Sequence, residues 1–437
     1  MKYTDPKLTI IIPTRNRSQS LEYTIKTCIS QDYEDLSILI SDNASSDSTM
    51  EIVKSINDPR VRYINTSQRL SMTKNWEFAL SHVNDGYVSF IGDDDGFLPN
   101  AAKNIASIIK ETNTKAISWN KAEYHWPNHP NSSLKNMLMI PVNNNLLEFP
   151  SKQAIKHSTR FWLPYNKLPT LYNSFVSYNV INACREAGQP FFRSVTPDVY
   201  SGLALLKVMD SYLYSSRPFS VNGSSAFSNG ASSIYGSKLE GEGSIFMSEI
   251  DLEQNNLFQV IPGAVYSNIA EAFLQANKYC FEDKLTFNHK LIVKLILRDI
   301  YRYLPERREQ SLRELFNMVD SINLRKFTEK TSRSIEFNNK EIAKETSKKS
   351  IINNGNLILD AHSLNVGNID DACNLVGKIL GVYRIPSSVE TYSLFTLGMT
   401  KKCRDFTIYS TYKDGMFFLK KYISAIFYLL LNKLKLK

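Results

Sequence analysis

Three features that mark common protein classes are missing from this sequence. It has no CxxC pair, and its five cysteines are scattered with no histidine at ligand spacing, which argues against a zinc site or a disulfide framework. The N-terminus runs straight into a short apolar stretch without the pattern of a signal peptide, so we expect a cytoplasmic protein with reduced thiols. No GxGxxG loop follows an expected strand, which weakens a NAD-binding interpretation.

Basic charge is also scarce outside one end of the chain. The formal net charge is +9, yet residues 401–437 alone hold nine Lys or Arg against two Asp, a balance of +7. Only +2 remains for the first 400 residues. A nucleic-acid-binding surface needs basic residues spread over the body of the protein, so we expect no nucleic-acid partner.

No apolar run in the basic C-terminal segment, 411–437, is long enough to cross a bilayer. Its longest uncharged stretch, 422–432, has eleven residues, whereas a spanning helix needs about 20. Aromatic and leucine side chains flanked by lysines are typical of an amphipathic helix in the membrane interface. We predict that this tail holds the protein peripherally on the inner face of the cell membrane. The alternative is a terminal helix that packs on the rest of the protein.

What the sequence does contain is a regular alternation over residues 1–120. Short β-branched runs alternate with amphipathic stretches, which is the βαβ rhythm of a doubly wound sheet. The expected strands are 8–12, 36–40, 61–64 and 87–91, and the expected helices are 18–31, 46–56, one around 76–83, and 101–109. Ligands of such sheets bind at the carboxyl ends of the strands. The segments expected to carry a site are therefore 13–17, 42–47, 65–69 and 92–96.

Three adjacent carboxylates follow the fourth expected strand. Asp93, Asp94 and Asp95 repel one another unless a cation or solvent compensates their charge. Mg²⁺ and Mn²⁺ favour carboxylate and phosphate oxygens. The sequence therefore predicts a divalent metal site here, and a solvated acidic turn is the alternative.

Polar residues also stand at the ends of the first two strands. Pro13, Thr14 and Arg15 follow the first strand, and Asp42 follows the second. The Asp42 carboxylate could accept hydrogen bonds from a nucleobase or a ribose, whereas Asp47 is better explained as a cap of the next helix.

In this order and spacing, residues 8–110 resemble the nucleotide-binding half of a family 2 glycosyltransferase. The matching segments are an apolar strand ending in IPTRNR, the turn SDNASSD, a helix that carries Asn75, and FIGDDDGFLP. The resemblance implies a GT-A fold, an α/β domain with a Rossmann-like, doubly wound mixed sheet. Here a mainly helical C-terminal region follows it. The expected domains are 1–240, with a nucleotide-binding half at about 1–120 and an acceptor half at about 121–240, then a helical domain at 241–410 and the tail at 411–437.

The resemblance also implies roles for individual residues. Asp42 resembles the carboxylate that reads the nucleobase, and Arg69 resembles the basic residue that contacts nucleotide or phosphate. The acidic loop resembles a DxD-type motif, but Gly92 stands where many members have an acid, so the choice of metal ligand stays open among the three aspartates. The expected nucleotide-sugar-binding residues are Pro13, Thr14, Arg15, Asp42, Arg69, Asp93 and Asp94, and the expected ligands of Mn²⁺ or Mg²⁺ are Asp95 and Asp93.

Family 2 enzymes, as the resemblance implies, invert configuration at the sugar carbon, which needs a carboxylate base on the acceptor side. Asp198, in RSVTPDVYSG, is the best candidate, and Glu186 is the second. The alternative for Asp198 is an acid in the first turn of a helix, where the helix dipole favours negative charge.

These expectations combine into one function. They describe an inverting, metal-dependent glycosyltransferase of the bacterial surface-polysaccharide type. It would move a sugar from a nucleotide sugar, with UDP favoured, to a hydroxyl of a glycan or lipid-linked glycan. Two alternatives stay open: a catalytically silent, membrane-associated assembly partner, and a sugar nucleotidyltransferase. The second alternative expects a glycine-rich phosphate loop after the first strand, and residues 13–17 contain no glycine. The sequence leaves the oligomeric state open.

Overall fold

The computed structural model describes residues 5–186, 188–228, 230–231, 248–302, 305–342, 352–353, 355–381 and 390–391. The tail at 411–437 lies outside these residues, so its expected membrane role stays a prediction. Among the described helices, none combines the length and the apolar character needed to cross a membrane.

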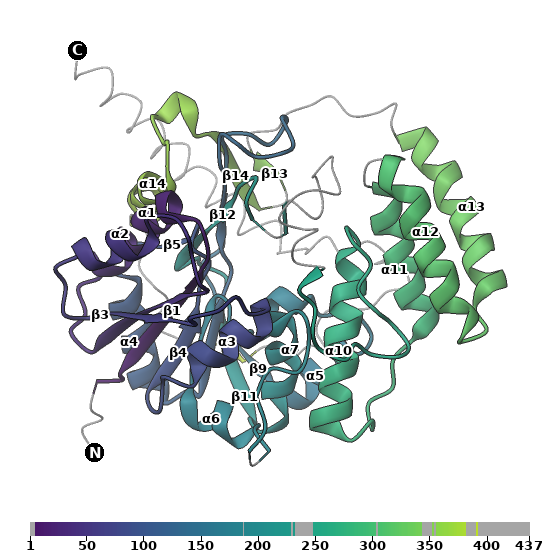
Figure 1. Ribbon diagram of the computed structural model, residues 1–437, viewed down its shortest axis with the longest axis horizontal. Helices are drawn as coiled ribbons and strands as arrows, with labels where there is room; N and C mark the ends of the chain where they lie inside the picture. Colours follow the sequence, from purple (N-terminus) through teal and green to yellow (C-terminus); the bar gives the residue numbers. More distant parts are fainter. Residues whose placement is uncertain are drawn as a thin grey trace.

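A nine-stranded mixed sheet forms the centre of the molecule, with strand order β15-β9-β11-β6-β10-β4-β1-β2-β3 (Figure 1). Four neighbouring strands are parallel: β1 (Leu8–Thr14), β2 (Leu36–Asp42), β3 (Val61–Asn65) and β4 (Tyr87–Phe90). Strand β10 (Ser174–Ser177) runs antiparallel between β4 and β6 (Ala116–Trp119). The sheet therefore begins as a doubly wound parallel sheet and continues as a mixed one, which confirms the expected fold class.

Strand β1 shows why an uninterrupted apolar run predicts a central strand. Successive side chains of a strand point to opposite faces of the sheet. Ile11 belongs to one hydrophobic core, and Ile10 and Ile12 belong to the other. Both faces are covered by helices, so both sets of side chains must be apolar.

The helices that cover these faces are the expected ones. They are α1 (Ser18–Ile29), α2 (Thr49–Ser55), α3 (Met72–Leu80) and α4 (Ala101–Thr112). Leu21 and Ile25 of α1 lie in the core with Ile10, whereas Trp76 and Leu80 of α3 lie in the core with Ile11. Helical spacing of apolar residues therefore places them on the buried faces of α1 and α3.

A second, six-stranded sheet brings together short strands from distant parts of the chain, and the sequence analysis did not predict it. Its order is β13 (Ile352–Asn353), β14 (Asn356–Asp360), β8 (Met137–Pro141), β7 (Ala122–His125), β12 (Ser220–Ser224) and β5 (Gly96–Phe97). The stretch that begins at residue 222 is rich in Ser, Gly and Asn, a composition that is typical of a loop. Its first residues are instead strand, because β12 pairs with both β7 and β5.

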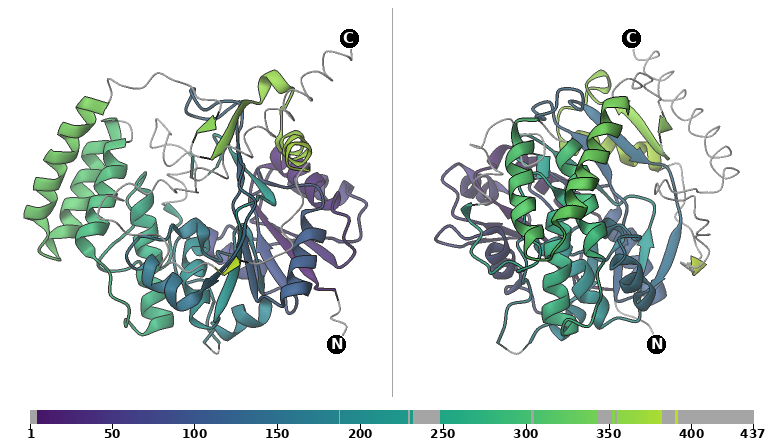
Figure 2. Two further views of the ribbon diagram at one scale, coloured as in Figure 1. Left: turned by 180° about the vertical axis from the view of Figure 1, so that it is seen from behind. Right: turned by 90° about the vertical axis from the view of Figure 1, so that its right-hand side faces the viewer.

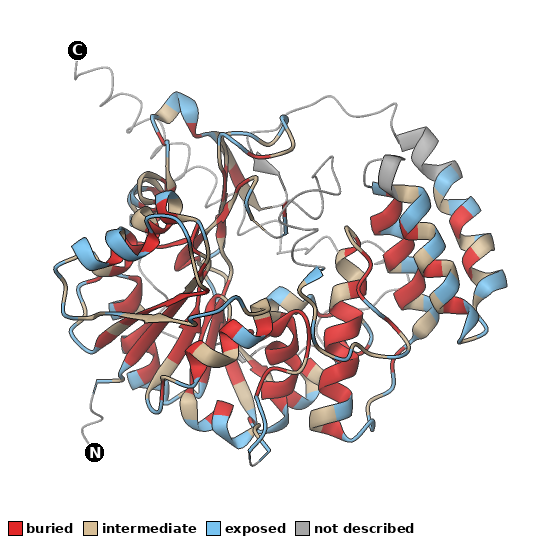
Figure 3. Ribbon diagram, in the orientation of Figure 1, coloured by how far each residue is buried: buried red, intermediate tan, exposed pale blue. Residues whose placement is uncertain are grey.

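Four long helices form a separate layer beside the α/β domain (Figures 1 and 2). They are α10 (Val265–Phe281), α11 (His289–Arg302), α12 (Pro305–Asp320) and α13 (Arg325–Ile342). Helix α10 packs against α7 (Pro197–Ala204), and buried residues line the inner faces of α10 and α11 (Figure 3). The helical C-terminal region is therefore present, and its first helix touches the acceptor half.

The chain then returns to the α/β domain. Strand β14 pairs with β8, strand β15 (Glu390–Thr391) pairs with β9 (Leu146–Pro150), and helix α14 (Ile369–Leu380) packs against α1 (Figure 2). Within the expected, mainly helical segment 241–410, the four long helices end at residue 342, and the described residues from 352 onward join the α/β domain. The remaining elements are α5 (Ser151–Ser158), α6 (Tyr178–Ala183), β11 (Ser211–Ser215) and the short helices Tyr165–Lys167, Leu205–Lys207 and His362–Leu364.

Candidate functional site

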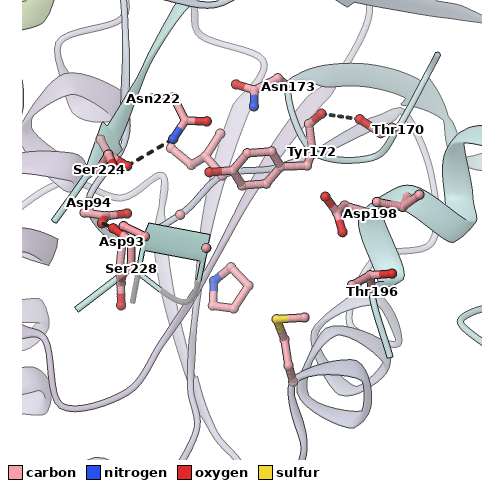
Figure 4. A pocket seen from close by; sticks show the side chains of 18 of the residues that line it. Asp93, Asp94, Thr170, Tyr172, Asn173, Thr196, Asp198, Asn222, Ser224 and Ser228 are labelled. Atoms are coloured by element: carbon pink, nitrogen blue, oxygen red, sulfur yellow. Dashed lines mark hydrogen bonds between the residues drawn. The ribbon is translucent and has the colours of Figure 1, made fainter. Parts of the chain in front are cut away.

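A cavity of about 490 Å³ lies at the carboxyl ends of β1 and β4. Part of its wall is shown in Figure 4. The wall includes six of the residues expected to form the site: Pro13, Thr14, Arg15, Asp93, Asp94 and Asp198. Asp42, Arg69, Asp95 and Glu186 do not line it. The structure therefore brings the first strand end, the acidic loop and the candidate base together, and it places four other candidates outside the wall.

Asp93 joins the ends of two neighbouring strands. Its Oδ2 accepts a hydrogen bond of 2.7 Å from the Thr14 hydroxyl, and its Oδ1 forms a 2.9 Å ion pair with Arg17. Strands β1 and β4 are adjacent and parallel, so their carboxyl ends meet at this point. The pairing rule for parallel strands thus predicted the position of Asp93, although it did not predict Arg17 as its partner.

Asp95 anchors the acidic loop. Its carboxylate is completely buried and accepts hydrogen bonds from the backbone N–H groups of Gly92 and Gly223, both at 2.8 Å, and from the Tyr172 hydroxyl. Both oxygens are therefore engaged by the protein. Asp95 and Asp93 were the expected metal ligands, and that expectation stays a prediction; of the three aspartates, Asp93 and Asp94 line the cavity and Asp95 does not.

Asp94 is the acid of the loop whose charge is least compensated. Burial raises its pKa to about 7, the nearby Asp95 carboxylate adds to the rise, and the Arg17 charge opposes it. The hydroxyls of Ser225 and Ser228 donate to Asp94 Oδ2. A carboxylate this buried beside two others is a position where a divalent cation would relieve repulsion.

Glycine is required beside this loop. A Cβ atom on Gly223 would lie 1.9 Å from the backbone oxygen of Asp94, closer than any two such atoms can approach. Strand β12 can therefore approach the acidic loop only because residue 223 has no side chain. This contact also brings the Gly223 N–H within hydrogen-bond distance of Asp95.

Asp42 is engaged by its own neighbours. Its Oδ2 accepts hydrogen bonds from the Tyr63 hydroxyl at 2.5 Å and the Asn65 amide at 3.0 Å, and its Oδ1 accepts one from the Ser45 N–H at 2.9 Å. Its exposed fraction is 1%. The next residue, Asn43, lines the cavity instead. Asp42 shapes the turn after β2, and its role toward a nucleobase stays a prediction.

Arg15 and Arg69, the two arginines expected to bind the nucleotide, both form ion pairs with Glu249. Both oxygens of Glu249 lie 3.0 Å from Arg15, and Arg69 forms a second ion pair with the same group. Glu249 lines the cavity, whereas the Arg69 side chain is half exposed. Arg69 therefore reaches the site through Glu249, a residue that no pattern in the sequence points to.

Asp198 lies across the cavity from the acidic loop. It occupies the first turn of α7, directly after Pro197, and Figure 4 shows the Tyr172 ring between it and the pair Asp93 and Asp94. Burial raises the pKa of Asp198, and the positive charge of Lys121 is among the influences that lower it. A carboxylate with a raised pKa that faces a cavity is suited to accept a proton.

Hydrogen bonds from two other helices hold the loop before Asp198. The Thr73 hydroxyl of α3 donates to the Ser194 carbonyl at 2.8 Å, and the Ser194 hydroxyl donates to Glu271 of α10. The Glu271 side chain is fully buried, and burial raises its pKa to about 7. The helical region thus helps to position the candidate base.

Comparison with known proteins agrees with this geometry. The family model described as "Glycosyl transferase family 2" matches residues 9–176. A Campylobacter jejuni protein described as GalNAc(5)-diNAcBac-PP-undecaprenol beta-1,3-glucosyltransferase is 36% identical over 111 residues, which are 25% of this chain and 35% of that protein. The Escherichia coli protein described as UDP-Glc:alpha-D-GlcNAc-diphosphoundecaprenol beta-1,3-glucosyltransferase WfaP is 27% identical over 118 residues, which are 27% of this chain and 46% of that protein.

The match thus spans between a third and a half of the length of these relatives. Among solved structures, Staphylococcus aureus TarS 1-349 superposes with a TM-score of 0.40 at 15% identity, over 79% of this chain and 94% of that one. By the family comparison, residues 9–176, which hold β1, the acidic loop and the first half of the sheet, match the model of glycosyl transferase family 2.

Proposed function

We propose that this protein is an inverting glycosyltransferase that moves a sugar from a nucleotide sugar to a hydroxyl of a glycan acceptor. The observation that carries the proposal is the placement of Asp198 across one cavity from Asp93 and Asp94. A donor bound at the strand ends would present its sugar toward Asp198. UDP is the favoured nucleotide and a lipid-linked glycan the favoured acceptor, because the relatives' descriptions name UDP-Glc and undecaprenol-linked sugars.

Residues of the acidic loop fit a divalent metal ion. Asp93 and Asp94 present carboxylate oxygens, the ligands that Mg²⁺ and Mn²⁺ prefer, to the cavity. Within the described ranges, no group of three or more His, Cys, Asp or Glu is arranged to hold a metal ion. A site with two protein carboxylates leaves room for the donor's phosphate oxygens, which is how Mg²⁺ is usually held. The bound ion would stabilise negative charge on the departing diphosphate.

The chain's own residues account for the other steps. Asp198, as the carboxylate, accepts the proton of the acceptor hydroxyl while the oxygen forms its bond to the sugar carbon. The bond from that carbon to the nucleoside diphosphate breaks in the same displacement, so configuration inverts and no covalent enzyme intermediate is needed. Tyr172 and Asp95 hold the loop that carries Asp93 and Asp94 in place during this step.

A nucleotide-binding screen tests the proposal. Purified full-length protein is titrated with UDP, GDP, dTDP and their common sugar conjugates, with and without Mn²⁺, and hydrolysis of each conjugate is followed. We expect one nucleotide class to bind in a Mn²⁺-dependent manner. Absence of both binding and hydrolysis across the panel would refute the proposed function.

A further inference from the structure

The cavity wall contains three cationic side chains, and two of them are already paired. Arg15 is paired with Glu249, and Arg17 is paired with Asp93. Lys121 also lines the cavity, but it forms no ion pair with any acidic residue in the described part of the chain. Its hydrogen bond goes to a neutral amide, so among the described residues that line this wall it is the cation without an acidic partner.

Lys121 is positioned by the crossover between the two sheets. It lies between β6 and β7, and its ammonium donates a hydrogen bond to Asn222 Oδ1 on the neighbouring strand β12. The same ammonium lies 5.2 Å from the centre of the Tyr172 ring. Asn222 and Tyr172 together fix where the charge sits in the cavity.

Lys121 lies over the aromatic ring that separates the acidic loop from the candidate base. Burial raises the pKa of the Asp198 carboxyl, and the charge of Lys121 is close enough to oppose that rise. Tyr172, the ring beneath the ammonium, is the residue that Figure 4 shows between Asp93, Asp94 and Asp198. The bond that breaks during transfer would therefore lie near this ammonium.

Among the described residues, this half-buried ammonium contacts an amide and an aromatic face and forms no ion pair, so its charge is incompletely compensated there. An ammonium carries three donors, and Asn222 accepts from one of them. An oxyanion is the group that would satisfy both its charge and its remaining donors. Resting on the proposed function, we propose that Lys121 binds an oxyanion of a substrate at the point of transfer.

Two groups could supply this oxyanion. One is the diphosphate of the donor, which gains negative charge as it leaves. The other is an acidic group on the acceptor, such as the diphosphate of a lipid-linked sugar. Both present phosphate oxygens, so the chemistry recognised at Lys121 is the same and only the substrate that carries it differs.

Three variants of the full-length protein test the proposal. Lys121→Met removes the charge at similar length, Lys121→Arg keeps the charge, and Lys135→Met removes an exposed charge away from the cavity. Thermal unfolding of each variant reports whether it folds. Binding of UDP, uridine and inorganic pyrophosphate is measured with Mn²⁺ by calorimetry.

If the oxyanion is the donor's, Lys121→Met weakens UDP and pyrophosphate binding by about 10-fold or more, because a charge-assisted hydrogen bond is lost. Uridine binding stays unchanged. Lys121→Arg retains most of the affinity, and Lys135→Met matches the wild type. If the oxyanion is the acceptor's, nucleotide affinity is kept. The KM of Lys121→Met then rises for a diphospholipid-linked sugar but not for the uncharged alkyl glycoside of the same sugar.

Three other results would overturn the inference. Wild-type protein that binds UDP, with Lys121→Met unchanged in both the nucleotide and the acceptor measurements, removes the role of Lys121 and leaves the proposed function intact. Wild-type protein that binds no nucleotide in the panel removes the proposed function and this inference with it. Equal losses in Lys121→Met and Lys121→Arg would indicate a structural role and would also count against it.

Discussion

At the scale of single residues, the acidic loop shows three adjacent aspartates with three different surroundings. Asp93 pairs with Arg17, Asp94 is buried with a raised pKa, and Asp95 is held by hydrogen bonds on both oxygens. That a metal site should lie here was predictable from charge repulsion. The sequence could not predict that Asp95 anchors the loop, because two of its hydrogen-bond partners, Tyr172 and Gly223, lie far along the chain.

Asp198 is the residue whose replacement separates chemistry from binding. Asp198→Asn keeps the size of the side chain and removes its ability to take a proton. We expect transfer to fall by roughly 10²–10⁴-fold, the usual contribution of general-base catalysis, while the dissociation constant for the nucleotide stays within a factor of about two. Initial rates and calorimetry on the same preparation measure both.

Asp210→Asn provides the matched control, because Asp210 is exposed and lies away from the cavity. It should behave as the wild type. Loss of nucleotide binding in Asp198→Asn would remove Asp198 from the role of base, and loss of transfer in Glu186→Gln alone would give that role to Glu186.

At the scale of elements, the local patterns located the parallel half of the sheet within about two residues. The apolar runs of β1 and β2 and the apolar faces of α1 and α4 are determined by nearby residues. The second sheet was missed because its strands are short and depend on pairing between distant segments, such as β7 with β12. The contact of α10 with the loop before α7 could not be predicted either, because it also joins segments that are distant in the sequence.

This contact makes a prediction about pH. Burial raises the pKa of Glu271 from 4.5 to about 7, so between those values the folded state binds more protons than the unfolded state. The free energy of unfolding should therefore fall as pH rises through this window. Glu271→Gln does not titrate and can still accept the Ser194 hydrogen bond, so its stability relative to wild type should rise by up to about 3 kcal/mol between pH 4.5 and 8.

Urea unfolding at pH 5, 6, 7 and 8 provides the measurement. The matched control is Glu253→Gln, at an exposed position nearby, which should follow the wild-type curve at every pH. A constant difference between Glu271→Gln and wild type across the series would show that Glu271 does not titrate in the folded protein.

At the scale of the whole molecule, the proposed acceptor and the basic tail both suggest that the protein works at a membrane surface. A lipid-linked acceptor is confined to the membrane, and residues 411–437 carry lysines beside apolar side chains. Protein ending at residue 410 should therefore lose binding to vesicles that contain anionic lipid, since each basic residue near such a surface contributes about 1 kcal/mol. Co-sedimentation of full-length and shortened protein measures the difference.

Nucleotide binding by the shortened protein is the internal control, because the described residues that line the cavity lie between positions 13 and 269. It should equal that of the full-length protein. Equal vesicle binding by the two proteins would contradict a tail anchor and would favour a terminal helix that packs on the protein.

The return of β14 and α14 to the α/β domain has a consequence for synthesis of the chain. Strand β8 receives its outer partner β14, and α1 receives α14, only from residues beyond 355. While the ribosome is still making the four long helices, the finished N-terminal half presents an open sheet edge and an apolar helix face, both of which favour aggregation. The α/β domain can therefore be completed only after the ribosome has passed residue 380. A fragment that ends near residue 240 should be much less soluble than the full chain.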